Sequence, residues 1–396
     1  MLRSIQKVSL SLLVALSLVP IALCGVGRAS VVTLPDGGRC EGELSDGKIN
    51  GEAVCDYANG DRYQGEFKDG QPHGRGTYTF AEGGQYEGEF VNGQFHGQGV
   101  REFANGNRYE GEFQNGKFHG TGIYSVANGM QYEGEFVEGS PSDRGTFTFA
   151  NGNRCTGAIA DGKLSAEGTC EYANGNRYEG ELHNNQPEGQ GVYSFAEGGQ
   201  YEGEFRQGQF HGQGVREYAN GDRYEGEFRE GKPHGRGNFT FADGGEYQGE
   251  FQAGQFHGQG IREEANGKRY EGEFQNGKPH GEGILSFENG NQYEGEFVEG
   301  QFSGEGTYSF ANGNRYRGEF RQGQFSGEGT YSFANGDRCE GEFSEGKFNG
   351  SGTCVYANGD TYEGEFLDGE KHGQGIYIYA DGTRIEGEWE NGKLQK

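Results

Sequence analysis

Six cysteines fall into three pairs with one common spacing, which suits disulfide chemistry. The pairs are Cys40 and Cys55, Cys155 and Cys170, and Cys339 and Cys354. Each pair lies within one copy of a 23-residue repeat, at the same two positions, and no copy carries only one of the two cysteines. Joint replacement indicates that the two positions touch. We therefore predict one disulfide within each pair.

Two other roles for the cysteines explain the pattern less well. Buried cysteines can act as small apolar filling, but this does not require that they change in pairs. Zinc needs four ligands, and two thiols without nearby histidine or further cysteine form an incomplete site. A disulfide closing a loop of roughly 15 residues contributes about 3 kcal/mol in the chain-entropy model.

Eight of the nine histidines also recur at one repeat position, which raises the question of a metal. They are His73, His96, His119, His211, His234, His257, His280 and His372. Neighbouring copies of a two-stranded unit lie about 9.6 Å apart, twice the strand spacing, whereas zinc–nitrogen bonds measure about 2.0–2.1 Å. Recurring Glu residues such as Glu110 and Glu112 supply too few oxygens for Ca²⁺. We expect no metal, cofactor or catalytic site, because a regular array offers no unique constellation.

The repeat itself predicts a β-hairpin. Starting at Cys40, fifteen units of 23 residues follow without gaps to Arg384, and a partial unit starts at Ile385. Positions 1 to 5 of a unit read Tyr-Glu-Gly-Glu-Phe, as in 109–113, which alternates like a strand. Position 8 is Gly in nearly every unit, where the chain turns, and positions 14, 16 and 18 form a second alternating strand. Ala-Asn-Gly at positions 19 to 21 predicts another turn.

The cysteine pairs fix the expected register of each hairpin. They place position 1 opposite position 16, and therefore the glycines at positions 3 and 14 opposite each other. Continued alternation predicts position 5 opposite position 12, with a loop over positions 6 to 11. One face then carries aromatic rings, with glycines leaving room for them, and the other carries glutamates. Successive hairpins join into an elongated single-layer antiparallel meander, twisted or trough-shaped.

These motifs resemble the MORN (membrane occupation and recognition nexus) repeat. The resemblance covers residues 40–396 and rests on Tyr-Glu-Gly-Glu-Phe, Asn-Gly-Lys, His-Gly-x-Gly and Ala-Asn-Gly recurring in register. It implies an elongated antiparallel sheet with roles in scaffolding near membranes, protein contacts and, in some members, phospholipid binding. Some plant lipid kinases carry similar repeats before a kinase domain, but we do not expect a kinase activity from these repeats.

The N-terminal residues 1–29 read as a signal peptide. Arg3 and Lys7 precede an apolar run that ends near Cys24. Cleavage is expected after Cys24 or after Ala29, while an uncleaved anchor and a lipoprotein cysteine at Cys24 are the alternatives. Residues 30–39 form a short lead-in with the tail of a degenerate repeat, and 40–396 the array. The protein is therefore expected outside the cytoplasm, periplasmic or extracellular, where disulfides form.

One stretch of the array departs from the pattern. Residues 156–159 read Thr-Gly-Ala-Ile in place of Glu-Gly-Glu-Phe, and the preceding unit has Ser142-Asp143 in place of His-Gly. We interpret the Cys155–Cys170 pair as a staple for a weak hairpin, with a bend near 140–170.

The net charge of the chain disfavours two classes of binding partner. The formal net charge is −27, which disfavours nucleic acid and an anionic membrane surface. We predict a non-enzymatic exported scaffold that binds a protein or a cell-envelope component, with end-to-end self-association through the ends of the sheet. Phospholipid binding and cell-wall glycan binding through exposed aromatic rows are the alternatives, and the glycan role requires rings that face solvent.

Overall fold

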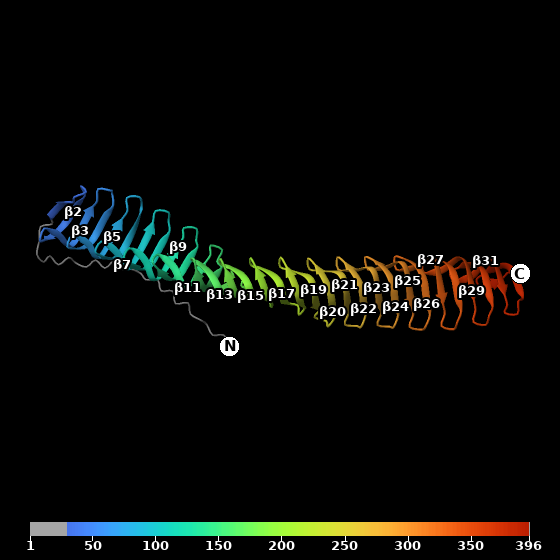
Figure 1. The fold of residues 1–396 in the computed structure, drawn as a ribbon. Helices are drawn as coiled ribbons and strands as arrows, with labels where there is room; N and C mark the ends of the chain where they lie inside the picture. The colour runs from blue at the N-terminus through green and yellow to red at the C-terminus, as the bar shows by residue number, and fades with distance from the viewer. Residues whose placement is uncertain (1–29, 396) are drawn as a thin grey trace, which may run out of the picture. The chain divides into compact units, whose positions relative to one another are not determined.

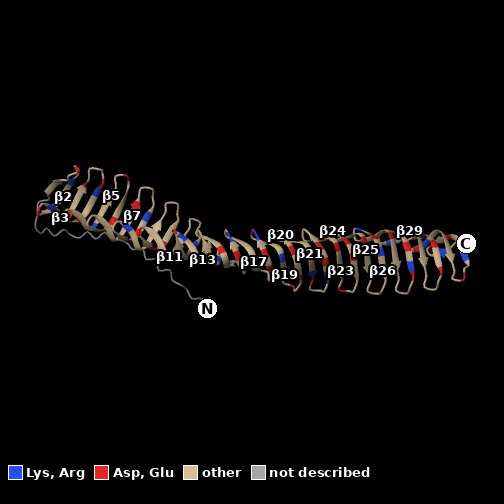
Figure 2. Cartoon of the chain, in the orientation of Figure 1, with Lys and Arg blue, Asp and Glu red and all other residues tan. Residues whose placement is uncertain are grey.

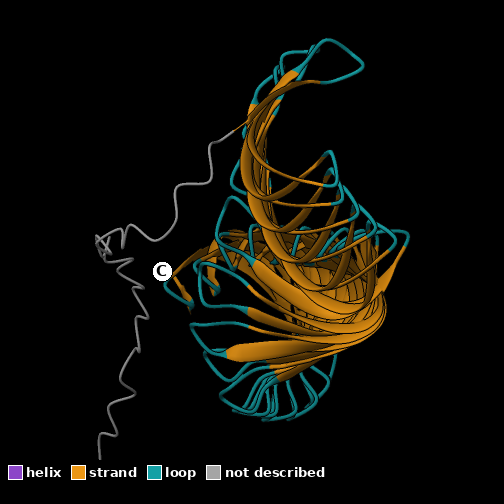
Figure 3. Ribbon diagram, turned by 90° about the vertical axis from the view of Figure 1, so that its left-hand side faces the viewer, coloured by secondary structure: helices purple, strands orange, loops and turns teal. Residues whose placement is uncertain are grey.

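The computed structural model describes residues 30–395, and every regular element in this range is a β-strand (Figure 1). The 33 strands belong to an antiparallel sheet in which turns join strands that follow one another in the chain (Figure 3). This confirms the predicted all-β meander of 23-residue hairpins. The predicted signal peptide, residues 1–29, lies outside the described residues. Over residues 30–395 there is no helix long and apolar enough to cross a membrane.

The chain divides into two compact units, one formed by residues up to 127 with 136–139, the other by residues 128–135 and those from 140 on. The strands of the first unit are β1 (Ser30–Thr33), β2 (Arg39–Ser45), β3 (Lys48–Asp56), β4 (Arg62–Lys68), β5 (Gln71–Thr79), β6 (Gly84–Val91), β7 (Gln94–Phe103), β8 (Arg108–Gln114) and β9 (Lys117–Ser125). Strand β10 (Gln131–Val137) has residues in both units.

The second unit holds the remaining strands. They are β11 (Ser140–Thr148), β12 (Arg154–Ala160), β13 (Lys163–Glu171), β14 (Arg177–His183), β15 (Gln186–Ser194), β16 (Gly199–Arg206), β17 (Gln209–Tyr218), β18 (Arg223–Arg229), β19 (Lys232–Thr240), β20 (Glu246–Gln252), β21 (Gln255–Glu263), β22 (Arg269–Gln275), β23 (Lys278–Ser286), β24 (Gln292–Val298), β25 (Gln301–Ser309), β26 (Arg315–Arg321), β27 (Gln324–Ser332), β28 (Arg338–Ser344), β29 (Lys347–Val355), β30 (Thr361–Leu367), β31 (Glu370–Ile378), β32 (Arg384–Glu390) and β33 (Lys393–Leu394).

The register predicted for the start of each hairpin is confirmed. Position 1 lies opposite position 16, as in Tyr293 opposite Tyr308, and position 3 lies opposite position 14, as in Gly295 opposite Gly306. The same two pairings recur in both units, for example Tyr109 with Tyr124 in β8 and β9. The second strand is shorter than predicted in most hairpins, because it ends at position 17, before the aromatic residue at position 18.

The predicted pairing of position 5 with position 12 is wrong. Phe297 at position 5 pairs with Phe302 at position 10, because the register shifts between Gly295 and Glu296. A bulge of two residues, positions 12 and 13, absorbs the shift on the second strand. The loop predicted over positions 6 to 11 is therefore a two-residue turn at positions 7 and 8. Asn115 (φ 49°) and Gly116 (φ 81°) are both left-handed there, as a type I′ hairpin turn requires.

The core of the sheet is a layer of rings on one side, called the ring face. Tyr293 at position 1 is fully buried and stacks on Phe302 at 3.9 Å between ring centroids. It also contacts Phe297 at 5.1 Å and, from the next hairpin, Phe320 at 4.8 Å, both edge-on. Each tyrosine therefore links its own hairpin to the next one, which explains why a thin sheet with few aliphatic residues holds together.

Glycines at positions 3 and 14 lie directly beneath these tyrosines, as predicted. A Cβ atom at Gly306 would lie 2.6 Å from the Tyr293 hydroxyl oxygen. That hydroxyl donates hydrogen bonds to the carbonyl oxygens of Glu296 (2.9 Å) and Ser303 (3.3 Å), which fixes the ring over the glycine pair. The same arrangement recurs at Tyr86 and Tyr201.

Candidate functional site

The three cysteine pairs lie on the ring face, at the places that tyrosine and an aromatic residue hold in other hairpins. The structure joins each pair in a disulfide with a Cα–Cα distance of 4.0 Å, that of directly opposed cross-strand residues. The six cysteines are at most 9% exposed. Substitution of Tyr by Cys at position 1 therefore removes a ring that otherwise covers the glycine pair.

The neighbours of the first and third disulfides compensate for the missing ring. In the first repeat unit, Ala53 replaces the glycine at position 14, and its Cβ packs toward Gly42. Near the third disulfide the Phe348 ring, at position 10, moves over Gly352 and Gly341 instead. These exchanges show that the side chains at positions 1, 10 and 14 share one space.

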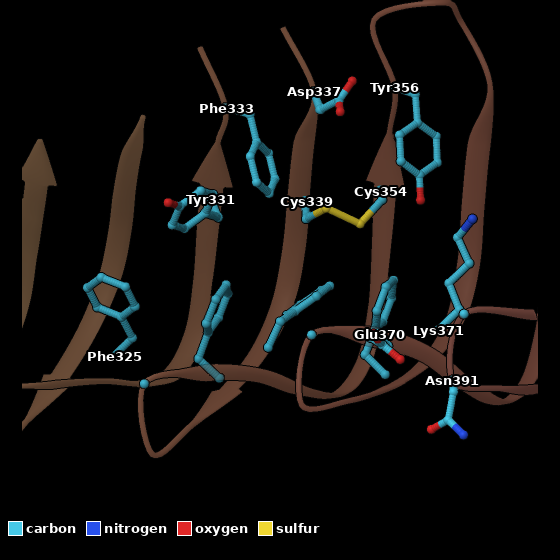
Figure 4. Close-up of a pocket in the computed structure, with 16 residues that line it drawn as sticks. Phe325, Tyr331, Phe333, Asp337, Cys339, Cys354, Tyr356, Glu370, Lys371 and Asn391 are labelled. Carbon is cyan, nitrogen blue, oxygen red and sulfur yellow. A yellow bond between two sulfur atoms is a disulfide. The ribbon is translucent and has the colours of Figure 1, made fainter. Parts of the chain in front are cut away.

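The third disulfide borders a groove on the ring face, with a volume of about 430 Å³ (Figure 4). Cys339 and Cys354 lie at its centre, between the rings of Phe333 and Tyr356 (Figure 4). Phe333 is 40% exposed, in contrast to the buried rings at positions 1 and 5. The groove forms because the cysteine pair is smaller than the two rings that fill this place elsewhere. Its lining combines aromatic rings with polar side chains such as Asp337 and Glu370.

A lysine lies at one end of the groove, at the place of the usual Phe or Pro at position 10. The Lys371 Nζ lies 4.4 Å from the Tyr377 ring centroid, 5.1 Å from Tyr356, 5.2 Å from Tyr362 and 5.3 Å from Trp389. Burial lowers the pKa of Lys371, while the Asp360 carboxylate acts in the opposite direction. Cation–π contact with four rings holds the ammonium in place. Lys371 was not predicted from the sequence as a functional residue, although it visibly replaces the usual Phe or Pro at position 10.

Three arginines replace the aromatic residue at position 16 and lie between rings. The Arg101 Cζ is 3.4 Å from the Phe80 centroid, and the Arg216 Cζ is 3.4 Å from that of Phe195. Arg262 lies over Phe241 at 5.4 Å. Desolvation lowers the pKa of Arg101 and Arg216. These guanidinium groups act as flat ring substitutes that extend the stacked layer.

The recurring histidines serve the fold through their backbone. The carbonyl oxygen of His96 accepts a hydrogen bond from the Tyr86 hydroxyl (3.2 Å), and that of His211 does so from Tyr201 (3.1 Å). Within residues 30–395 no three His, Cys, Asp or Glu side chains are grouped so as to hold a metal ion. The side chain of His234 lies 3.4 Å from the Arg229 guanidinium, on the face opposite the rings.

The glutamates on the opposite face, called the acid face, do two different things. Glu at position 4 accepts a hydrogen bond from the backbone N–H of position 13 in several hairpins, as Glu204 does from Gln213 (3.0 Å), so it closes the bulge. Glu at position 2 pairs with the arginine two residues earlier, as Glu271 does with Arg269 (2.7 Å). Acidic and basic side chains accordingly recur along both units (Figure 2). This structural role of position 4 was not predicted from the sequence.

One repeat unit, which starts at Tyr316, carries a positive charge where most others carry glutamate at position 2. Arg317 takes the place of Glu at position 2, so neither it nor Arg315 has an ion pair among residues 30–395. Both arginines and Arg338 line a hollow of about 600 Å³ on the acid face, which Glu305, Glu328 and Glu340 also line. Opposed carboxylates therefore balance the extra positive charge.

The geometry defines a β-hairpin repeat protein, with one ring face, one acid face and a fixed register. The MORN repeat family matches the chain in fifteen consecutive segments, from 40–62 to 362–384, and again at 386–395. The chain belongs to the MORN-repeat family. No curated protein matches its sequence.

Solved structures resemble the chain only distantly. The TCP10 domain of Danio rerio CPAP, in complex with a STIL peptide, is 16% identical with a TM-score of 0.29, covering 61% of this chain and 96% of that one. The Drosophila melanogaster SAS-4 TCP domain is 14% identical with a TM-score of 0.21, covering 46% and 94%. Staphylococcus aureus virginiamycin B lyase is 11% identical with a TM-score of 0.12, covering 71% and 88%. TM-scores this low carry no argument about function.

Proposed function

We propose that the protein is a non-enzymatic scaffold of an oxidising compartment outside the cytoplasm, which binds partner proteins on its ring face. The observation that carries the proposal is the groove beside Cys339 and Cys354, where the ring face is hollowed and the Phe333 ring reaches solvent. Concave apolar surfaces with exposed aromatic rings suit the side chains of a protein partner. The three disulfides favour the oxidising compartment, since reduced thiols prevail in the cytosol.

The two alternative ligands have less support. A glycan platform needs continuous rows of exposed rings, but the rings at positions 1 and 5 pack on one another, as Tyr247 does on Phe251 and Phe256. The exposed rings of the described residues, Phe333 and Tyr379, both stand at position 18 and lie two repeat units apart. An anionic phospholipid surface would meet a chain of net charge −27, and the hollow lined by Arg315, Arg317 and Arg338 is also lined by three glutamates. A protein partner avoids both difficulties.

Site-specific photo-crosslinking tests the proposed binding face. A photoreactive phenylalanine analogue replaces Phe333 in the groove, and a matched control carries it at Val355. Val355 is 48% exposed and lies at position 17 of the neighbouring unit, whose Cys354 faces the groove, so its side chain points to the opposite face. The experiment uses the chain in its producing cells and identifies adducts from the exported fraction by mass spectrometry.

We expect a protein adduct at position 333 that is absent at 355. Equal adducts at both sites, or adducts at neither, would contradict binding through the ring face. A protein found only in the cytosolic fraction would contradict the proposed compartment.

A further inference from the structure

The two ends of the described sheet expose complementary halves of one hairpin. At the first end, β1 pairs only with β2 among the described residues. At the other end, β33 pairs with β32 only at Trp389 and Glu390, and the Gln395 N–H donates to the Glu388 carbonyl oxygen, so within residues 30–395 the outer edge of 384–387 has no partner strand. Exposed edges of this kind offer unpaired backbone N–H and C=O groups to another strand.

The register shows which part of a hairpin each end supplies. Ser30 pairs with Gly42 and Val32 with Cys40, as Gly99 pairs with Gly111 and Arg101 with Tyr109 elsewhere. The four residues of β1 therefore hold positions 14 to 17. Ile385 and Gly387 of β32 hold positions 1 and 3, which pair with 16 and 14 within a hairpin.

The side chains at the two ends are compatible with each other, but not with the tyrosine and glycine that most repeat units carry at positions 1 and 14. A residue with a Cβ at position 14 collides with a tyrosine at position 1, since the Cβ at Gly306 would lie 2.6 Å from Tyr293. Ser30 has such a Cβ, and its counterpart at position 1 would be Ile385. The first repeat unit already shows a non-aromatic residue at position 1, Cys40, together with Ala53 at position 14.

Two further residues support the match. Leu394 at position 10 lies over Gly387 at position 3, just as Phe348 lies over Gly341 in a unit without tyrosine at position 1. Val31, which is 52% exposed, would lie opposite Glu386, as Val100 lies opposite Glu87.

We propose that a second copy of this chain docks head to tail, with the β32 edge of one copy pairing with the β1 edge of the next. Val32 then lies opposite Ile385 and Ser30 opposite Gly387, so the contact rebuilds the start of one hairpin. Such a heterologous contact continues the sheet from copy to copy. Salt promotes association, because each chain carries a net charge of −27 and counterions screen the repulsion.

Disulfide trapping tests the register. V32C and I385C are prepared as separate variants of the full chain and purified after export, with the native six cysteines already paired. Mixed under mild oxidation, they should form a reducible heterodimer, while neither variant forms a dimer with itself. V31C is the matched control, because Val31 neighbours Val32 but faces the other side of the sheet; it should not crosslink to I385C.

Failure of V32C to crosslink with I385C would overturn the proposal. Dimers of V32C alone or I385C alone would do the same, since they indicate symmetric pairing of like edges. Crosslinking of V31C as efficient as that of V32C would also contradict the register.

A complementary exchange tests the side-chain fit without cysteine. I385Y restores the residue common at position 1 and should weaken self-association by about tenfold, measured by sedimentation, because the new ring meets the Ser30 Cβ. S30G in the same chain should restore association. Unchanged association of I385Y, or no recovery in the double variant while both remain folded by circular dichroism, would contradict the proposed contact.

Discussion

Replacement of Gly306 by Ala tests whether a tyrosine at position 1 requires a glycine beneath its ring. The added Cβ would lie 2.6 Å from the Tyr293 hydroxyl oxygen, 2.7 Å from its Cε2 and 2.8 Å from its Cζ. The ring cannot move aside easily, because it is fully buried and stacks on Phe302. Phe297 and Phe320 also hold it at its edges.

The expected cost has two parts. Overpacking a filled core costs about 1–3 kcal/mol. A displaced ring also weakens the hydrogen bonds from its hydroxyl to the carbonyl oxygens of Glu296 and Ser303, which adds about 1 kcal/mol. We therefore expect G306A to lower the free energy of unfolding of this hairpin by about 2–4 kcal/mol. Amide hydrogen exchange over residues 292–309 is the assay, since repeat arrays open locally.

A double-mutant cycle with Y293A separates the clash from other effects of the alanine. Without the ring, G306A should cost far less, because nothing then occupies the space above position 14. The first repeat unit, with Cys40 at position 1 and Ala53 at position 14, shows that this combination folds. An equal cost of G306A with and without the Tyr293 ring would refute the reasoning.

Two further predictions concern the bulge and the buried phenols. G258A should lower the free energy of unfolding by about 1–2 kcal/mol, because φ there is +56° and the new Cβ would lie 2.8 Å from the Glu250 Cδ. Adding E250A should recover part of this loss, since Ala158 at position 4 accompanies Ala166 at position 12 in the chain. A greater loss in the double variant, measured by urea unfolding, would contradict this. Burial raises the pKa of Tyr362 to about 12, above the usual value near 10, so its contribution to stability is complete below pH ~10 and is lost as the pH rises toward 12. Tyrosinate absorbance and loss of β-sheet circular dichroism should therefore rise together above pH ~10, whereas phenols that titrate near pH ~10 in an intact sheet would argue against buried rings.

The sequence alone predicted the period, the hairpins and the register at their open ends, for physical reasons. A fixed 23-residue spacing leaves no freedom in the alignment, and the joint change at Cys40 and Cys55 marks two touching positions. Alternation then places glycine opposite glycine, as in Gly295 and Gly306. The bend expected near 140–170 and the signal peptide stay predictions.

The strand pairing near the turn of each hairpin was not predicted, because the alternation of the two faces along the strand breaks there. The Asn115-Gly116 dipeptide is a strong type I′ signal, but using it requires a two-residue bulge that alternation does not reveal. Glu204 escaped for the same reason, since its role is to close that bulge. The groove depends on side-chain volume, namely two small cysteines in the place of two rings, and Lys371 became notable only through the four rings around it.

The most direct test of an exported hairpin scaffold is peptide mapping of the protein taken from its native source, alkylated before any reduction. We expect three linked peptide pairs, Cys40 with Cys55, Cys155 with Cys170 and Cys339 with Cys354, and no alkylated repeat cysteine. Six alkylated cysteines would contradict the oxidising compartment, and links between different repeat units would contradict the register of position 1 opposite position 16.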